Sequence, residues 1–336
     1  MKKKKVLIVA HHYSTFVMRD VRILEKEYEV VMHKYTGGKD LRSNFLAQIK
    51  LLFFFIVNAM RVHAIYVWFA DYHTFLPVLF SRLWRKPSFV IEGGYDTVSI
   101  PEIKYGSHQK ALRSSMSTYS MKHCTLNLPV CETLTPEIKE RAPFAQIEHV
   151  YTGYDPNMFI AGTGKEKIVL TVADGNTEQR IRLKGVDTFV ELARRMPEYK
   201  FIVIGMKAKA REILGELPAN LELYNLMPIE ELIIYYQKAK VYTQFSMREG
   251  LPNVVCEAML CECVPVGFRT GGIPVAIGDA GYTMDFGDID KAQDAIHRAM
   301  GDDGNLGKKA RKHVIDKFPL SLREDKLLKL LRETKA

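Results

Sequence analysis

Short apolar runs alternate with helical patterns along the whole chain. The runs are rich in β-branched and aromatic residues and are bounded by polar or turn-forming residues. They predict strands at Val6–Ala10, Glu29–His33, Ala64–Phe69, Ser88–Glu92, Cys124–Leu128, Ile168–Val172, Phe201–Gly205, Leu221–Tyr224, Val241–Thr243 and Val264–Gly267. Apolar positions at helical spacing predict helices over Phe16–Lys26, Phe75–Trp84, Val186–Arg195, Ile229–Ala239, Val254–Leu260, Lys291–Met300 and Leu322–Arg332. Strands that alternate with helices are typical of α/β units built on parallel sheets.

The same alternation fills both halves of the chain. A turn-rich stretch, Tyr151–Pro156, separates the halves, with Gly162 and Gly164 just beyond it. A chain of 336 residues is also long for a single hydrophobic core. We therefore expect one α/β domain over residues 1–155, a second over residues 156–318, and a C-terminal helix in residues 319–336 that can pack back on the first domain.

Residues 43–60 form the most apolar of the helical patterns. The apolar side chains cover most of the circumference of this helix: Phe45, Leu46, Ile49, Leu51, Leu52, Phe53, Phe54, Phe55, Ile56 and Val57. So wide an apolar surface favours a helix buried in its own domain. The alternative is a helix that rests on a membrane, which its aromatic side chains and its basic neighbours Arg42, Lys50 and Arg61 support.

Positive charge is concentrated in the first half. Lys and Arg outnumber Asp and Glu by 21 to 14 in residues 1–160, but only by 27 to 25 in residues 161–336. This excess indicates an anionic partner, such as a membrane surface, a phosphorylated acceptor or a nucleic acid, and the alternative is an ordinary solvated surface. The sequence carries no legible nucleic-acid-recognition module, so we expect no nucleic-acid partner.

Cysteine usage and hydropathy bear on the compartment. The five cysteines lack the spacing of a disulfide framework, which fits a reducing environment. Cys261 and Cys263 have no second Cys or His pair nearby, so we expect no metal there. No apolar run approaches the roughly 20 residues that cross a bilayer, and Val6–Ala10 is too short for a signal peptide. We expect a cytoplasmic protein, with peripheral attachment to the inner face of the membrane as an option.

Two carboxylates, Glu249 and Glu257, flank a Gly, a Pro and an Asn. Gly250 and Pro252 break regular structure, and Pro252 is well suited to the first position of the helix that follows. Backbone N–H groups at such a helix start, with the positive end of its dipole, favour phosphate. The carboxylates would instead accept hydrogen bonds from hydroxyls. Hydroxyls on either side of a diphosphate are typical of a sugar nucleotide.

A second group of charged residues follows the strand at Ile168–Val172. A polar loop there carries Arg180, Arg182 and Lys184, and Lys184-Gly185 opens the next helix. Cations that leave the carboxyl end of a strand point to the edge where open α/β sheets bind ligands. They can neutralise a diphosphate and stabilise it as it leaves. The alternative is a solvated cluster of charges on a loop.

These motifs together resemble the retaining glycosyltransferases of family 4. Glu249–Met259 matches that family's Glu-x7-Glu signature, and Cys263–Val266 and Thr270–Pro274 continue the match. Two further elements are similar to the family's pattern: Val150–Asp155 at the entry to the second domain and Val130–Glu132 before it. Glu262 stands where the family usually has Gly, and Val275 where an acidic residue often follows. The resemblance implies the GT-B fold, with two Rossmann-like domains whose parallel sheets face a central cleft.

The resemblance also implies roles for particular residues. Glu249 would contact hydroxyls of the donor sugar, and Glu257 those of the ribose. Lys184, with Arg180 preferred over Arg182, would hold the diphosphate. The remaining donor-binding positions, by the same resemblance, are Gly250, Leu251, Pro252, Asn253, Asn225, Leu226, Gly271 and Gly272.

The first domain would bind the acceptor. Many relatives place a His-Asp pair after a strand here, and Asp96 is our candidate for the acidic position. His73 also follows a strand and is a candidate for the catalytic set, although a lone His is more often structural. Four residues after the first strand lie where the family approaches its acceptor: His11, His12, Ser14 and Thr15. The alternative for these four is a tight turn with exposed imidazoles.

The expected activity is that of a retaining, hexosyltransferase-type glycosyltransferase. It would move a sugar from a UDP- or GDP-sugar to a hydroxyl of a lipid-linked or polysaccharide acceptor in cell-surface glycan synthesis. No cofactor or metal is expected, because the cationic side chains do what Mg²⁺ would otherwise do. The alternative is a catalytically silent nucleotide-sugar-binding or scaffold protein on the same fold. A dehydrogenase is disfavoured, because no Gly-x-Gly-x-x-Gly follows a predicted strand.

Overall fold

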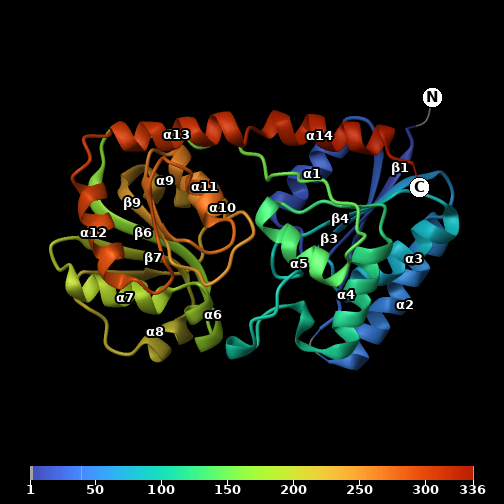
Figure 1. Ribbon diagram of the computed structural model, residues 1–336, viewed down its shortest axis with the longest axis horizontal. Coiled ribbons are helices and arrows are strands. Elements are labelled where there is room, and N and C mark those ends of the chain that lie inside the picture. The colour runs from blue at the N-terminus through green and yellow to red at the C-terminus, as the bar shows by residue number, and fades with distance from the viewer. Residues whose placement is uncertain (1–2, 39, 336) are drawn as a thin grey trace. The chain divides into compact units, whose positions relative to one another are not determined.

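The structure, a computed structural model, describes residues 3–38 and 40–335 (Figure 1). The chain divides into two compact units. Unit 1 comprises the chain up to Thr152 together with the segment from Ser321 onward, and unit 2 comprises Gly153–Leu320. Each unit is built on its own parallel sheet.

Unit 1 is a five-stranded sheet with strand order β2-β1-β3-β4-β5. Its strands are β1 (Lys5–Ala10), β2 (Glu29–Lys34), β3 (Val62–Trp68), β4 (Ser88–Ile91) and β5 (Leu126–Asn127). Its α-helices are α1 (Thr15–Glu25), α2 (Leu41–Asn58), α3 (Phe75–Trp84), α4 (Ala111–His123), α5 (Thr135–Arg141) and α14 (Leu320–Glu333). Short 3₁₀ turns lie at Tyr72–Thr74, Pro101–Ile103, Ser107–Gln109 and Glu132–Leu134. Figure 1 shows α1 and α14 on one face of this sheet and α2, α3 and α4 on the other.

Unit 2 is a six-stranded parallel sheet with strand order β11-β10-β9-β6-β7-β8. Its strands are β6 (Glu166–Gly175), β7 (Lys200–Met206), β8 (Leu221–Tyr224), β9 (Ala239–Gln244), β10 (Val264–Phe268) and β11 (Tyr282–Met284). Its helices are α6 (Glu178–Leu183), α7 (Val186–Arg195), α8 (Ala208–Leu214), α9 (Ile229–Lys238), α10 (Asn253–Leu260), α11 (Ile273–Ile277), α12 (Ile289–Met300) and α13 (Asn305–Lys317). The core on one face lies between the sheet and α7 and α12.

The alternating pattern of the sequence predicted this architecture. Each predicted strand overlaps a strand of the structure, and the two parallel sheets confirm the α/β class. Central strands such as β3 and β7 are covered on both faces, which is why they form nearly continuous apolar runs. The prediction missed β11 and several helices, of which α4 is the longest in unit 1. This helix is rich in Ser and has no clear apolar stripe.

The helix at residues 43–60 differs from the favoured expectation. Ala47, Leu51 and Phe55 of α2 are buried against the sheet of unit 1. Its opposite side is exposed and still apolar, so the prediction of a helix buried in its own domain holds for one face only. One face of α2 suffices to cover the sheet, and α3 packs beside it rather than over it. Among the helices of residues 3–38 and 40–335, none has the length and hydropathy to cross a bilayer.

A buried ion pair fastens α14 within unit 1. Arg323 donates from Nε to Asp20 Oδ1 at 2.6 Å and from Nη2 to Oδ2 at 2.7 Å. Its Nη1 donates to the carbonyls of Val150 and Tyr151. The same Asp20 carboxylate accepts from two further side chains of the sheet, the Tyr66 hydroxyl and the Trp68 indole. The aspartate joins helix α1, the sheet and the C-terminal segment.

Removing the guanidinium should therefore destabilise unit 1. We expect Arg323→Leu to cost about 3–5 kcal/mol in the free energy of unfolding, because it leaves Asp20 buried without its cation. Urea denaturation followed by fluorescence measures the loss. Arg332→Leu is the matched control, since Arg332 pairs with Glu27 on the surface and should matter little. Equal losses for the two variants would contradict the assignment of Arg323 as the anchor of α14.

Candidate functional site

The candidate site of unit 2 lies where three neighbouring strands end. β10, β9 and β6 are adjacent and parallel, so their carboxyl ends meet at one edge of the sheet. The loop after β6 leads through α6 to Lys184, the loop after β9 carries Glu249, and the loop after β10 carries Gly271 and Gly272. Ligands of open α/β sheets bind at this edge.

Lys184 and Glu249 are in direct contact there. Lys184 Nζ lies 2.6 Å from Glu249 Oε1, and the two side chains are 20% and 15% exposed. The same oxygen accepts from Gln244 Nε2 at 3.1 Å and from Ser246 Oγ at 2.7 Å. Three donors therefore fix one carboxylate oxygen at the rim of the sheet. Gln244 and Ser246 were not predicted; their positions directly before Glu249, at the end of a strand, were the available signal.

The segment with Arg180 and Arg182 is helical, and the expectation of a loop there is wrong. Thr177 starts α6 by accepting from the backbone N–H of Arg180, and Ile181 and Leu183 are buried beneath it. Arg180 and Lys184 lie four positions apart, on one face of this turn. Arg182 is exposed on another face. Arg180 Nη2 lies 3.4 Å from Asp174 Oδ2.

Glu257 lies in the second turn of α10. It is 8% exposed and accepts from the Tyr236 hydroxyl through Oε2 at 3.3 Å. The helix begins at Asn253 with Pro252 as its N-cap, one position later than expected. Gly250, Leu251 and Pro252 lead into this helix and are buried. Asn253 Oδ1 accepts from the hydroxyl of Tyr154 at 2.8 Å.

Backbone contacts hold the three loops together. Gly272 N donates to Glu249 O at 3.1 Å, and Met247 N donates to Leu183 O at 2.9 Å. Gly271 has φ of +51°, and a Cβ on it would lie 2.2 Å from Glu249 O. Gly185 has φ of +64°, and its Cβ would meet the carbonyl of Phe245 at 2.2 Å. Only glycine permits these close approaches.

Asn225 and Leu226 lie apart from this group. They follow β8, the edge strand, which β7 separates from β6. Leu226 is 71% exposed. The structure therefore places these two residues along the same edge of the sheet but away from Lys184 and Glu249.

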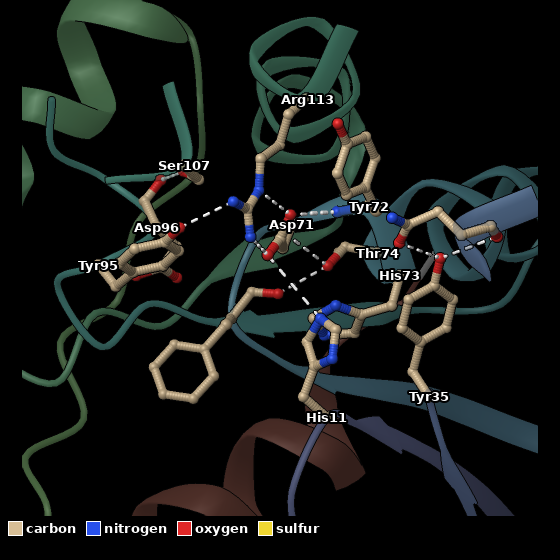
Figure 2. A network of polar contacts seen from close by, with 12 residues as sticks. His11, Tyr35, Asp71, Tyr72, His73, Thr74, Tyr95, Asp96, Ser107 and Arg113 are labelled. Carbon is tan, nitrogen blue, oxygen red and sulfur yellow. Dashed lines mark hydrogen bonds and ion pairs between the residues drawn. The ribbon is translucent and has the colours of Figure 1, made fainter. Parts of the chain in front are cut away.

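Unit 1 carries a separate polar network at the carboxyl ends of β1 and β3 (Figure 2). Arg113 of α4 donates to both oxygens of Asp71, from Nε to Oδ1 at 2.6 Å and from Nη2 to Oδ2. Its Nη1 donates to the Tyr95 hydroxyl at 2.8 Å. His11 and His73 lie beside the pair, with their ring centroids 4.4 Å apart. His11 Nε2 is 3.8 Å from Asp71 Oδ2.

The two imidazoles are held in their neutral form. Burial and the neighbouring His73 lower the pKa of His11 to about 3. Burial also lowers the pKa of His73, which is fully enclosed and donates from Nε2 to Trp68 O at 2.7 Å. His73 Nδ1 is then a buried acceptor without a partner. The structure brings the predicted His11 and His73 together, around an Asp71–Arg113 pair that the sequence did not reveal.

His11, Asp71 and His73 are of residue types that can also bind a metal ion. Ligand atoms of His11, Asp71 and His73 lie within 4.8 Å of one another. However, Arg113 already occupies both oxygens of Asp71, and the Tyr72 N–H donates to Oδ1 as well. The carboxylate charge is thus balanced by a guanidinium, which would repel a divalent ion. The arrangement fits an organised, charge-neutral surface better than a cation site.

Asp96 has a structural position. It is completely buried, and its oxygens accept from the backbone N–H groups of Ala70, Gly93 and Gly94. Burial raises its pKa to about 6. The carboxylate ties the loop after β3 to the loop after β4, and it has no surface left for a substrate. Neighbouring Glu92 is also buried, and burial raises its pKa well above the usual range.

The remaining acceptor-side candidates surround the start of α1. His12 and Thr15 are exposed, and Ser14 is the N-cap of α1, with a buried hydroxyl that has no hydrogen-bond partner. Only His11 of this group reaches the network of Figure 2. Asp71 and Arg113 were missed because they are 42 positions apart and belong to no motif.

The second half of the chain is similar to known glycosyltransferases. Residues 155–317 match the family model of "Glycosyl transferases group 1". N-acetyl-alpha-D-glucosaminyl L-malate synthase of Bacillus anthracis is 26% identical over 46% of this chain and 42% of its own. D-inositol 3-phosphate glycosyltransferase of Corynebacterium jeikeium is 32% identical over 45% of this chain and 41% of its own. The chain thus spans less than half the length of these curated relatives. The matches support a glycosyltransferase of the group 1 kind.

Solved structures resemble the chain over almost its full length. Sucrose-phosphate synthase from Thermosynechococcus elongatus has a TM-score of 0.81 at 13% identity, over 98% of this chain and 99% of its own. Anabaena HepE in complex with UDP has a TM-score of 0.77 at 14% identity, over 98% and 100%. At these identities the likeness shows the fold alone. The predicted GT-B fold class is confirmed.

Gly271 offers a test of how the loops are held. Gly271→Ala should cost about 1–3 kcal/mol in the stability of unit 2, because a Cβ at positive φ meets the carbonyl of Glu249. Thermal and urea unfolding measure the loss. Gly164→Ala is the matched control, since nothing lies within 4 Å of its added Cβ. Similar stability of the two variants would contradict close packing of the β9 and β10 loops.

The buried imidazole of His11 predicts that the stability of unit 1 depends on pH. The folded chain disfavours the imidazolium, whereas the unfolded chain takes up a proton near pH 6.5. The free energy of unfolding should therefore fall as the pH drops from 6.5 toward 3, by at most about 1.4 kcal/mol per unit for this group. Any stability advantage of the parent chain over His11→Gln should shrink across that window. His12→Gln, at an exposed position, should follow the parent; parallel curves for His11→Gln would refute the assignment.

Proposed function

We propose that the chain is a retaining glycosyltransferase that moves a hexose from a UDP- or GDP-sugar to a hydroxyl acceptor. The contact between Lys184 Nζ and Glu249 Oε1 carries this proposal. It joins a cation suited to phosphate with a carboxylate suited to sugar hydroxyls, at the sheet edge where ligands of such folds bind. The match to group 1 glycosyltransferases over residues 155–317 and the UDP complex of the similarly folded HepE support it.

In the proposed complex the Lys184–Glu249 pair exchanges partners. The diphosphate takes Lys184, with Arg180 from the same face of α6, and the donor sugar takes Glu249. Gln244 and Ser246 keep the carboxylate oriented during this exchange, since both donate to Oε1. Glu257, one and a half turns into α10, accepts from the ribose hydroxyls, and the backbone of Gly250–Asn253 lines the phosphates.

Bond cleavage separates an oxocarbenium-like sugar from a nucleoside diphosphate. The C1–O bond breaks with its electron pair going to the phosphate oxygen, where Lys184 and Arg180 take up the developing charge. The acceptor oxygen attacks the face that the leaving group vacates, and its proton passes to that phosphate, which retains the anomeric configuration. The cationic side chains make the reaction metal-independent in this proposal.

In this proposal unit 1 binds the acceptor. The neutral, partly exposed ring of His11 offers a hydrogen bond without net charge beside the balanced Asp71–Arg113 pair, which favours a sugar hydroxyl over an anionic group. The enclosed His73 packs against His11. The acceptor we propose is a lipid-linked or growing glycan in cell-surface glycan synthesis, reached from the cytoplasmic side of a membrane. The excess of Lys and Arg in residues 1–160 supports an anionic surface as a partner.

The two charged residues of unit 2 test the proposal. Lys184→Met and Glu249→Ala should each lower kcat/KM for nucleotide release by on the order of 10²–10³, because they remove charge stabilisation and sugar contacts in the transition state. Coupled detection of UDP or GDP with saccharide and lipid-linked acceptors gives the rates. Arg182→Met is the matched control and should stay within about threefold, since an exposed cation on another face of α6 is screened by solvent.

One outcome separates the enzyme from a silent relative. A chain that binds the nucleotide sugar tightly, releases no nucleotide with any acceptor, and binds equally well as Glu249→Ala would refute the transferase. It would instead favour a nucleotide-sugar-binding or scaffold protein on this fold.

A further inference from the structure

The outer side of α2 is a solvent-exposed apolar stripe. Its exposed side chains recur at helical spacing from the second turn to just beyond the last, at exposed fractions from 38% for Leu52 to 75% for Met60. They are Phe45, Leu46, Ile49, Leu52, Phe53, Ile56, Val57 and Met60. Leu79 and Leu83 of the adjacent α3 extend the surface. Contiguous apolar patches of this kind mark interaction sites.

Apart from Asp40, the exposed N-cap of α2, the charges along this part of the chain are positive. Between Leu41 and Ile91 the only acidic residue is Asp71, which Arg113 neutralises. The same stretch holds six cations: Arg42, Lys50, Arg61, Arg82, Arg85 and Lys86. Over the described residues none of these six forms an ion pair with a carboxylate. Their positive charge remains available to a partner.

Several of the cations meet at the amino edge of the sheet. β3, β4 and β5 are neighbours in the sheet. Arg61 directly precedes β3, Lys86 lies two positions before β4, and Thr125 directly precedes β5. Backbone bonds confirm the alignment, from Ile65 N to Pro87 O and from Thr125 N to Ser88 O, both at 3.0 Å. Because α2 runs back along the sheet, its last turn reaches this same edge. The apolar stripe therefore ends beside a row of cations.

A pocket at that edge concentrates the charge. It has a volume of about 470 Å³ and is lined by Arg82, Arg85, Lys86, Lys122 and His123, with the hydroxyl residues Ser81 and Thr125. Arg82 Nη1 lies 2.8 Å from His123 Nδ1. Four permanent cations in one concave space suit a phosphate group. The Ser81 hydroxyl already donates to Val78 O within the fold.

We propose that unit 1 docks on an anionic bilayer, with the outer stripe of α2 inserted at the interface and the pocket beneath α3 and α4 occupied by a lipid phosphate. An apolar face with aromatic side chains, basic flanks and no acidic residue has the composition of an interfacial helix. Aromatic rings sit well at the headgroup level. The 18 residues of α2 extend about 27 Å, and they lie along the surface rather than across it.

Charge decides between this occupant and a second copy of the chain. A symmetric contact through α2 would bring the same cations of both copies together without acidic partners, which is unfavourable. An anionic lipid surface attracts every one of them, at roughly a fivefold gain in binding per basic residue near the surface. The inference rests on the proposed function only in that a lipid-linked acceptor gives unit 1 a reason to meet a membrane.

Vesicle flotation with the full chain tests the surface, without donor or acceptor present. Phosphatidylglycerol vesicles should carry the protein upward and phosphatidylcholine vesicles should not. The double variant Phe45→Ser/Phe53→Ser should lower the partition coefficient roughly tenfold or more, because two large apolar groups lose their insertion. Phe144→Ser is the matched control: Phe144 is 94% exposed in unit 1 but lies outside α2, so its loss should leave binding unchanged.

Two triple variants that each remove three positive charges, one at the pocket and one elsewhere, test the pocket. Arg82→Gln/Arg85→Gln/Lys86→Gln should reduce binding to phosphatidylglycerol on the order of 100-fold, whereas Lys167→Gln/Lys209→Gln/Lys308→Gln, at exposed positions of unit 2, should reduce it far less. If inorganic phosphate displaced the protein from the vesicles by binding the pocket as tightly as they do, the pocket would be a site for a free anion, and its proposed role in binding lipid would be overturned.

Other outcomes would overturn the docking surface or reassign it. Equal binding to both lipids, or unchanged binding by the Phe45/Phe53 variant, would overturn the docking surface. A change in sedimentation from dimer to monomer in that variant, without a change in flotation, would assign α2 to self-association instead. Failure of flotation leaves the transfer reaction intact, because nucleotide release with a soluble acceptor is measured separately.

Discussion

The parallel alignment of β6, β9 and β10 is the constraint on which the candidate donor site depends. It brings Lys184 and Glu249, 65 positions apart in sequence, to within 2.6 Å. The side chains meet only because their loops touch first, through Met247 N to Leu183 O and Gly272 N to Glu249 O. Where glycine is replaced, a Cβ would push these loops apart before any charged group moved. The chemistry of the site is therefore set by backbone packing as much as by its charged residues.

Much of this arrangement could be predicted from the sequence, because it follows from local patterns. Alternating apolar runs indicated parallel strands, and cations and carboxylates just beyond strand ends indicated one shared edge. The Lys184–Glu249 pair follows from those two facts together. Helical spacing could also have separated Arg180 from Arg182, since only Arg180 lies four positions before Lys184. The capping role of Thr177 was the overlooked signal.

Other parts could not be predicted, since they depend on distant contacts. Asp96 follows a strand, as a catalytic acid would, but three backbone N–H groups enclose it. Nothing in its neighbourhood in sequence reveals that burial. Asp71 finds its partner on α4, a Ser-rich helix without an apolar stripe. The α2 helix is apolar over most of its circumference, although the fold covers only one of its sides. Glu262, which occupies a position usual for Gly, adopts φ of +63° just after α10. The backbone there keeps the turn that a glycine would take.

The two edges of the unit 1 sheet differ in how their charges are balanced, and this difference separates two kinds of recognition. At the carboxyl edge Arg113 is matched by Asp71, and burial keeps His11 and His73 neutral. Such a surface attracts neither sign strongly and selects by hydrogen-bond geometry, which suits hydroxyls. At the amino edge Arg61, Lys86 and their neighbours form no ion pair with a carboxylate among residues 3–38 and 40–335. A lipid-linked glycan presents both chemistries, with hydroxyls at one end and phosphate near the bilayer at the other. If the acceptor is lipid-linked, as we propose, a sheet with one balanced edge and one cationic edge suits both ends of it and keeps uncompensated cations away from the hydroxyls.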